Sequence, residues 1–459
     1  GNTVNLSYRG VQGRDDTGWY NPGCTSDSHY FDRASYLREV TYSGNDAGGA
    51  KRRLVFNISP KSYPNVPYGY VAYETHQLNS VEMYVADQKV RRYEFVHDYL
   101  SRSFGGVTRY DQRLLSVKEY GSVNGSAWDI SLPAITFEYA DHGVVECSRD
   151  GDTCSLWGIT YPRARLQRVR NGFGGSVTFT YTKQQGPQSG FYPAHQVCRE
   201  RFAVTAREVA DGFDSSSTGT WTYSYSGGKF DDDSFDGHTG REFRGYAEVR
   251  TTDPAGNLTI SRFLQNDIYK GRLSEEERYQ GSTRLLSKTT NVWGWRGDSR
   301  WPFVYLAETN TYSYDSNGAN PKRRKTTYDY DAYGNVSWVY DDGDVDTAQD
   351  NRRVSKGYVY NTTAWIVDRL LLERVYDANL VERSRTGYYY DQDPDVGLTW
   401  GYVPTKGDLV AIHRTSLDSA PHEWTYYWYD TYGNRVRTKD ALGNNTYFTY
   451  DATYHTFQT

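Results

Sequence analysis

A five-residue motif, Asp-x-x-Gly-Asn, recurs in the second half of the chain and restricts the folds that the chain can adopt. In each copy the Asp suits the first position of a tight turn, and the Gly suits a positive φ that a Cβ would strain. Because β-forming residues precede and follow these turns, each unit predicts a strand, a turn and a strand. The Asp and Gly residues of the four copies are Asp253 and Gly256, Asp331 and Gly334, Asp430 and Gly433, and Asp440 and Gly443.

The aromatic content indicates the same fold class. The chain has 44 tyrosines and 12 tryptophans but a single methionine, so large rings supply much of the apolar volume. Such rings favour strands. No long stretch carries apolar residues at the i, i+3, i+4, i+7 spacing of an amphipathic helix. We therefore predict an all-β protein built around a long antiparallel sheet.

The hairpin pattern also suggests how the chain is organised. We expect a turn-rich N-terminal segment at residues 1–35 and one continuous β-sheet repeat region at residues 36–459. Residues 182–194 contain much Gln, Gly, Pro and Ser, which is typical of a surface loop. Because the pattern is still running at residue 459, we expect the natural protein to continue beyond it.

Charge and hydropathy exclude two classes of partner. The formal net charge is −5, and the 52 basic and 57 acidic residues are interspersed along the chain. No basic face is therefore expected, which argues against a nucleic-acid partner. No apolar run approaches the roughly 20 residues that a membrane-spanning helix needs.

The four cysteines favour an exported protein. Cys147 and Cys154 enclose a short loop that contains Gly and Asp, a spacing that a disulfide can close. Cys24 and Cys198 are candidates for a second disulfide, and four buried reduced cysteines are the alternative. A zinc site is disfavoured because no CxxC pair accompanies them. An even cysteine count and a single methionine favour an extracellular or cell-surface location.

Three segments resemble the YD-repeat, or Rhs, superfamily. They are residues Tyr328–Val336, Tyr429–Val436 and Gly240–Tyr246. The sequence is similar in particular to the B components of insecticidal Tc toxins and to animal teneurins. The resemblance implies a sheet wound in a spiral into a hollow shell, or part of one, which in the toxin relatives encloses a C-terminal effector. The Asp-Pro-x-Gly-Leu autoprotease segment of those toxins is not found here.

Acidic and aromatic clusters are the candidate ligand sites. Asp341, Asp342, Asp344 and Asp346 offer carboxylate oxygens to Ca²⁺, but their spacing departs from the calcium-loop pattern, so a solvated turn is favoured. Aromatic runs such as residues 424–429 offer rings to sugars. They more often pack against a sheet face, since alternate residues of a strand point to opposite faces. We expect no cofactor.

The sequence lacks the common catalytic signatures. It has no Gly-x-Ser-x-Gly elbow, no His-Glu-x-x-His and no phosphate-binding glycine loop. We therefore expect a non-enzymatic exported structural protein that encloses or presents a cargo, its partners being its own C-terminal cargo or neighbouring subunits. One alternative is a cell-surface adhesin or filament module that self-associates or binds glycans. A second is a glycan-active enzyme that uses two carboxylates.

Overall fold

The computed structural model describes most of the chain. The described residues are 5–14, 30–42, 52–62, 76–104, 107–141, 144–146, 159–161, 164–184, 201–213, 218–230, 243–298, 301–416, 422–452, 455 and 458–459. They form strands β1–β28 and one short 3-10 helix, Ala348–Asp350, which confirms the all-β prediction. Among them, no helix is long and apolar enough to cross a membrane.

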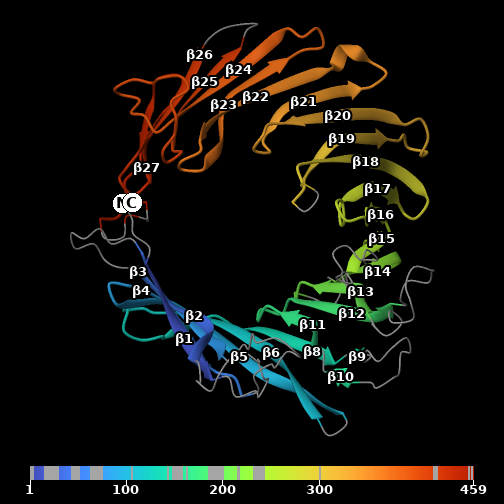
Figure 1. Ribbon diagram of the computed structural model, residues 1–459, viewed down its shortest axis with the longest axis vertical. Coiled ribbons are helices and arrows are strands. Elements are labelled where there is room, and N and C mark those ends of the chain that lie inside the picture. Colours follow the sequence, from blue (N-terminus) through green and yellow to red (C-terminus); the bar gives the residue numbers. More distant parts are fainter. Residues whose placement is uncertain are drawn as a thin grey trace, which may run out of the picture. The chain divides into compact units, whose positions relative to one another are not determined.

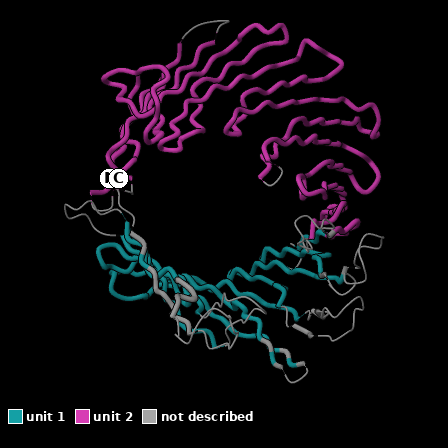
Figure 2. Tube along the Cα trace, viewed as in Figure 1, with its two compact units in different colours: residues 1–221 teal, residues 222–459 magenta. Residues whose placement is uncertain are grey.

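The chain divides into two compact units, Gly1–Trp221 and Thr222–Thr459, whose boundary falls within β14 (Figure 2). Apart from β9 and β10, which pair only with each other, the strands belong to an antiparallel sheet of 26 strands. The first unit contains β1 (Asn5–Arg14), β2 (Tyr30–Tyr42), β3 (Arg52–Pro60), β4 (His76–Val85), β5 (Gln88–Phe104), β6 (Val107–Gly121), β7 (Ile130–Ser131), β8 (Ile135–Asp141), β9 (Val144–Glu146), β10 (Ile159–Tyr161), β11 (Ala164–Arg170), β12 (Ser176–Gln184) and β13 (Arg201–Ala210).

In the first unit, strands pair mostly with the strand next along the chain. β1 to β6 pair in sequence order, β6 pairs with β8, and β8 pairs with β11, so β9 and β10 form a side hairpin. All of β1 and the first residues of β2 lie within residues 1–35, where we expect a turn-rich segment. The two strands pair antiparallel, from Asn5 with Thr41 to Arg14 with Tyr30.

The second unit follows the chain without exception, as each strand from β14 to β27 pairs antiparallel with the next (Figure 1). Its strands are β14 (Thr218–Phe230), β15 (Phe243–Thr252), β16 (Leu258–Phe263), β17 (Leu273–Gln280), β18 (Arg284–Arg296), β19 (Phe303–Ser313), β20 (Lys322–Tyr330), β21 (Val336–Asp344), β22 (Arg352–Asn361), β23 (Ile366–Tyr376), β24 (Glu382–Tyr390), β25 (Leu409–Ser416), β26 (His422–Tyr429), β27 (Arg435–Lys439) and β28 (Asn445–Tyr447).

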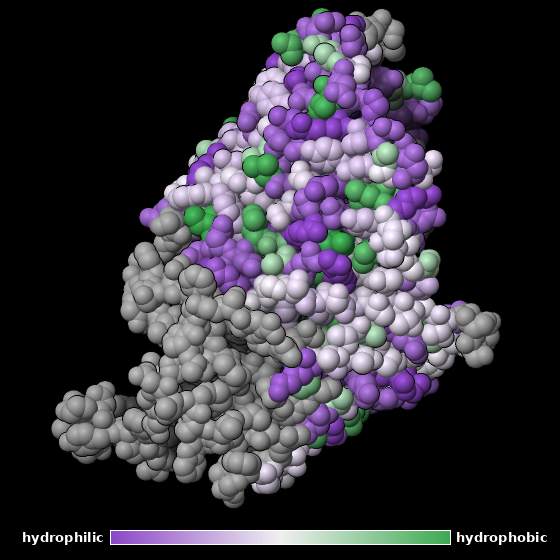
Figure 3. Space-filling model, turned by 90° about the vertical axis from the view of Figure 1, so that its right-hand side faces the viewer, coloured by the Kyte–Doolittle hydropathy of each residue, from purple (hydrophilic) through white to green (hydrophobic). Residues whose placement is uncertain are grey.

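The sheet has little fully buried core. Among the described residues, the buried hydrophobic side chains are Ile260, Val359, Tyr390, Val410 and Ala411, and most other strand residues are half-buried. On the face shown in Figure 3, hydrophobic residues lie singly or in small groups among hydrophilic ones. Contacts between neighbouring strands therefore carry much of the stability, each contributing roughly 0.2–1 kcal/mol.

Two sequence expectations fall largely outside the described residues. Of the loop expected at residues 182–194, the structure describes only the end of β12, as far as Gln184. Cys24, Cys147, Cys154 and Cys198 all lie outside the described residues. Both disulfides therefore stay predictions.

Candidate functional site

The four Asp-Gly turns share one hydrogen-bond pattern. At Asp331, the backbone N–H donates to the Asn335 carbonyl oxygen at 2.9 Å, while the Asp carboxylate accepts the Asn335 backbone N–H and side-chain amide, each at 2.8 Å. The glycines have φ values of 84° at Gly256, 94° at Gly334, 82° at Gly433 and 91° at Gly443. Equivalent bonds link Asp253 with Asn257, Asp430 with Asn434, and Asp440 with Asn444. The Asp thus satisfies the backbone of the turn that it begins.

A further turn of the same kind was missed by the sequence analysis. Asp377 donates its backbone N–H to the Val381 carbonyl oxygen at 3.0 Å, and its carboxylate accepts the Val381 N–H at 2.9 Å. Leu380 stands where the other copies have Gly, with a φ of 62°. The sequence signal that remains is the Tyr376-Asp377 dipeptide between two β-forming runs, because the glycine that marks the other turns is absent.

A second repeated contact joins tyrosine hydroxyls to β-bulges. The hydroxyl of Tyr390 on β24 donates to the carbonyl oxygen of Leu370 on β23 at 2.8 Å. On the other side of β23, Leu372 and Leu370 pair with consecutive residues of β22, so Leu371 is the extra residue of a bulge. A bulge disrupts the local ladder. The tyrosine therefore supplies a hydrogen bond beside the disruption.

This tyrosine–bulge contact occurs seven times among the described residues. In each, the acceptor is the carbonyl of the residue just before the extra residue of a bulge on the neighbouring strand. The hydroxyl-to-carbonyl distances span 2.8–3.1 Å. The pairs are Tyr139 with Leu114, Tyr181 with Leu166, Tyr330 with Leu306, Tyr358 with Val336, Tyr390 with Leu370, Tyr429 with Leu409, and Tyr450 with Arg435.

In the second unit these contacts form a continuous series. Each tyrosine has one cross-strand partner residue. The carbonyl of that partner accepts a hydrogen bond from the hydroxyl of the next tyrosine in the series. Tyr358, for example, pairs with Leu370, which accepts Tyr390. The series runs through Tyr330, Tyr358, Tyr390, Tyr429 and Tyr450.

The series explains the Tyr-Asp dipeptide of the repeat. Tyr330 and Tyr429 directly precede Asp331 and Asp430, so one dipeptide supplies both a hydroxyl for a bulge and a carboxylate for a turn. Burial raises the pKa of Tyr390 to about 12, so its hydroxyl stays protonated and able to donate well above neutral pH.

The acidic loop at residues 341–346, the candidate calcium site, forms ion pairs with basic residues of neighbouring strands. Arg324 donates to the Asp341 carboxylate, Lys322 Nζ lies 2.8 Å from Asp344, and Arg353 lies 2.8 Å from Asp342. The backbone N–H of Asp346 donates to the Asp344 carboxylate at 3.2 Å. Among the described residues, no three or more His, Cys, Asp or Glu side chains are grouped as a metal site.

Aromatic side chains on β26 stack on one another. The Trp424 and Tyr426 rings are 5.5 Å apart and 6° from parallel, and Trp428 follows at 6.0 Å. The Arg437 guanidinium lies 3.4 Å from the centre of the Trp428 ring. These ring faces are therefore largely covered by their neighbours, which leaves little flat surface for a sugar.

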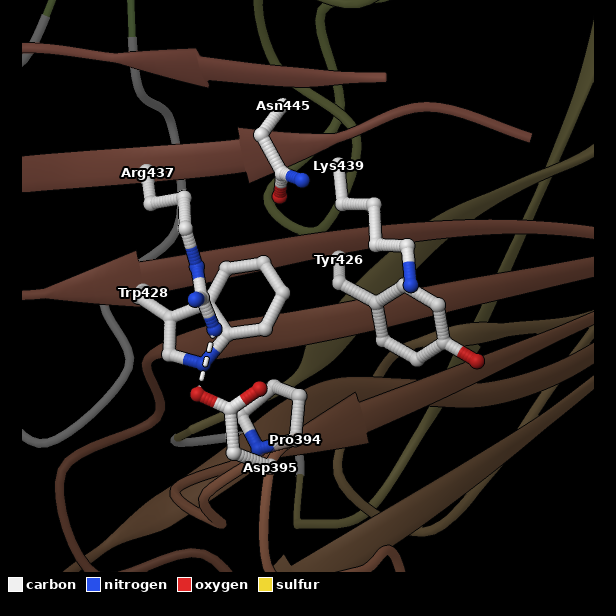
Figure 4. A pocket seen from close by; sticks show the side chains of 7 residues that line it. All are labelled: Pro394, Asp395, Tyr426, Trp428, Arg437, Lys439 and Asn445. Carbon is white, nitrogen blue, oxygen red and sulfur yellow. Dashed lines mark hydrogen bonds and ion pairs between the residues drawn. The ribbon is translucent and has the colours of Figure 1, made fainter. Parts of the chain in front are cut away.

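A small pocket opens beside these rings (Figure 4). Its volume is about 220 Å³, and Arg437 and Lys439 bring two cations to it while Asp395 is ion-paired with Arg437. The remaining lining residues are Pro394, Tyr426, Trp428 and Asn445. Its lining therefore combines charged and polar groups with aromatic rings.

Comparison with solved structures relates this fold to Tc toxins. A structure of TcdB2-TccC3 with Cdc42 matches with a TM-score of 0.65 and 10% identity, over 99% of this chain and 46% of the other. A structure of TcdB2-TccC3 matches with a TM-score of 0.58 and 12% identity, over 99% and 47%. The Tc holotoxin pore of Photorhabdus luminescens matches with a TM-score of 0.56 and 10% identity, over 99% and 46%.

The chain spans less than half the length of these similar structures. No family model matches it, and no curated protein matches it by sequence. At such low identity the likeness concerns the fold alone. The chain therefore shares the fold of the part of these structures that it matches.

Proposed function

We propose that this chain is a non-enzymatic section of an exported protein shell that encloses or presents a polypeptide cargo. The observation that carries the proposal is the match to TcdB2-TccC3 over 99% of the chain. The strand order agrees with such a role, because a sheet that follows the chain strand by strand can extend as a wall. The partners would be a C-terminal cargo of the same protein or neighbouring subunits.

The side-chain chemistry supports a structural role over the two alternatives. Three acidic residues of the candidate calcium loop form ion pairs with Lys and Arg side chains of β20 and β22, and the β26 rings cover one another. The ion pairs leave no pair of free carboxylates for glycan hydrolysis in that loop. The second disfavours sugar stacking at β26, since stacking needs an exposed ring face.

Protease protection of the natural full-length protein tests the proposal. Purified protein is treated with a non-specific protease, and surviving fragments are identified by mass spectrometry. We expect a polypeptide from outside the repeat region to survive in the intact protein. It should be digested when the wall is weakened by the double change Tyr390→Phe and Tyr429→Phe. It should survive in Tyr447→Phe, a change at a residue that is 67% exposed.

Three results would overturn the proposal. One is that no fragment from outside the repeat region is protected. Another is turnover on a polysaccharide panel that is lost when one Asp or Glu is changed, which would favour a glycan-active enzyme. Concentration-dependent assembly or glycan-array binding by a protein without protected cargo would favour an adhesin. Fractionation of the producing cells tests export, because the proposal requires the protein outside the cytoplasm.

A further inference from the structure

Two histidines and a threonine on neighbouring strands bring three donor atoms together. His413 and Thr415 lie on β25, and His422 begins β26. His413 Nε2 and His422 Nδ1 are 3.1 Å apart, while Thr415 Oγ1 lies 3.4 Å from the first and 3.2 Å from the second. The three atoms thus form a nearly equilateral triangle on the protein surface.

The dimensions of this triangle match one face of a metal coordination shell. A tetrahedral Zn²⁺ ion with ligands at about 2.0–2.1 Å holds its donor atoms about 3.3–3.4 Å apart. Imidazole nitrogens are preferred ligands of zinc, copper and nickel. We propose that His413 and His422, with Thr415 beside them, form a surface site for a divalent transition-metal ion such as Zn²⁺ or Cu²⁺, with water completing the coordination.

Strand pairing and ring stacking restrain the positions of the two histidines. Thr415 and His422 are direct cross-strand partners, as are His413 and Trp424, so the strand register fixes the relative positions of the two histidines. The His413 ring stacks on Trp424, with ring centres 4.1 Å apart and planes 9° from parallel. This contact restrains one ligand ring, and orienting contacts of that kind strengthen metal sites.

A change of tautomer prepares the two facing nitrogens for a metal. In the free site one ring donates its N–H to the other. On metal binding, the donating ring carries that proton on its other nitrogen, and both facing nitrogens use their lone pairs for the metal. The ion lies to one side of the line that joins them.

Zinc binding to the protein and to matched variants tests the site. The metal alone, as Zn²⁺, is titrated calorimetrically into the full chain. We expect one site that is weakened at least tenfold by His413→Asn and likewise by His422→Asn. The matched control is His455→Asn, which changes a histidine that also stacks on an aromatic ring, Tyr432, and should leave the site unchanged.

Two further measurements distinguish this site from adventitious binding to the other seven of the chain's nine histidines. Electron paramagnetic resonance of one equivalent of Cu²⁺ should show coupling to two imidazole nitrogens, and to one in each His variant. Zn²⁺ should raise the Tm of the parent but not of the variants, because binding stabilises only the folded site. Absence of binding, or binding that persists unchanged in both variants, would overturn the proposal. The proposal is independent of the shell function.

Discussion

The Tyr390 hydroxyl lies 2.8 Å from the carbonyl oxygen of Leu370, beside the bulge at Leu371. Tyr390 is 7% exposed, so water cannot readily replace this bond. Tyr390→Phe leaves the ring in place and removes the donor. Because a buried carbonyl that loses its partner costs about 1–3 kcal/mol, we expect the free energy of unfolding to fall by about 1–2 kcal/mol in urea denaturation.

Tyr447→Phe is the matched control for that change. Tyr447 is 67% exposed, and exposed substitutions are usually within about 0.5 kcal/mol of neutral. Equal stability of the two variants would show that the hydroxyl–bulge contact contributes nothing.

Two turn glycines that share a backbone conformation should differ in their tolerance of alanine. A Cβ at Gly256 meets nothing within 4 Å, whereas a Cβ at Gly334 comes within 2.8 Å of the Phe303 ring. Both changes strain a residue with positive φ, at about 1–2 kcal/mol. Gly334→Ala adds overpacking, typically about 1–3 kcal/mol. Thermal unfolding should therefore give a lower Tm for Gly334→Ala than for Gly256→Ala, and the reverse order would contradict the packing argument.

A glycine substitution in the turn that lacks glycine should stabilise the folded protein. Leu380 has a φ of 62° and is 70% exposed, so Leu380→Gly relieves backbone strain and gives up little buried surface. The relief of about 1–2 kcal/mol is partly offset by the entropy of the added glycine, about 0.5–1 kcal/mol. We expect a net gain of about 0.5–1 kcal/mol in the free energy of unfolding.

Leu442→Gly provides the comparison for Leu380→Gly. Leu442 is an 88% exposed leucine in an Asp-Gly turn, but it does not have a positive φ. That variant should be destabilised, since it gains flexibility without relief of strain. If both variants shift stability in the same direction, strain at Leu380 is not the cause.

Acid should selectively weaken the loop after β24. The Asp391 carboxylate accepts backbone N–H groups from Thr405, Lys406, Gly407 and Asp408 at 2.6–2.9 Å. Burial alone would raise the pKa of Asp391, but these four donors outweigh it, so the pKa lies below the ordinary value of 3.8. The carboxylate is therefore charged in the folded protein at neutral pH.

The sign of the pH effect follows from that lowered pKa. The contribution of Asp391 is fully present above the unfolded pKa, near 3.8, and is lost as pH falls through the lower folded value. Asp391→Asn should cost about 2 kcal/mol at pH 7, because bonds to a charged acceptor are lost. The difference from the parent should shrink below pH 3.8 in pH-dependent denaturation. Asp346→Asn changes an exposed residue and is the control, which should stay within about 0.5 kcal/mol of the parent at pH 7.

The turns could be predicted from sequence because they are local. The carboxylate of Asp331 and the positive φ of Gly334 act within five residues, and residue preferences at that range are strong. The all-β class followed for the same reason, from repeated short hairpins and aromatic strands. Leu380 shows the limit of this reasoning, since the hydrogen bonds of Asp377 form the same turn without the expected glycine.

The tyrosine–bulge contacts could not be predicted because they depend on cross-strand register. Nothing near Leu370 in the sequence marks Leu371 as an extra residue, and the donor Tyr390 lies 20 residues away. The ion pairs of Asp341 and Asp344 are equally non-local, since Arg324 and Lys322 come from the preceding strand. Clustered acids in a sequence therefore do not reveal whether their charges are already neutralised.

Tyr358, Tyr390 and Tyr429 lie on β22, β24 and β26, and each reaches only the strand just before its own. A pair of strands that is duplicated or deleted would therefore include its own turn and its own tyrosine hydroxyl. The tyrosine–bulge contacts on either side of that pair would stay intact. Loss of a single strand would instead reverse the direction of every strand that follows. We therefore expect insertions and deletions in such proteins to comprise whole pairs of strands.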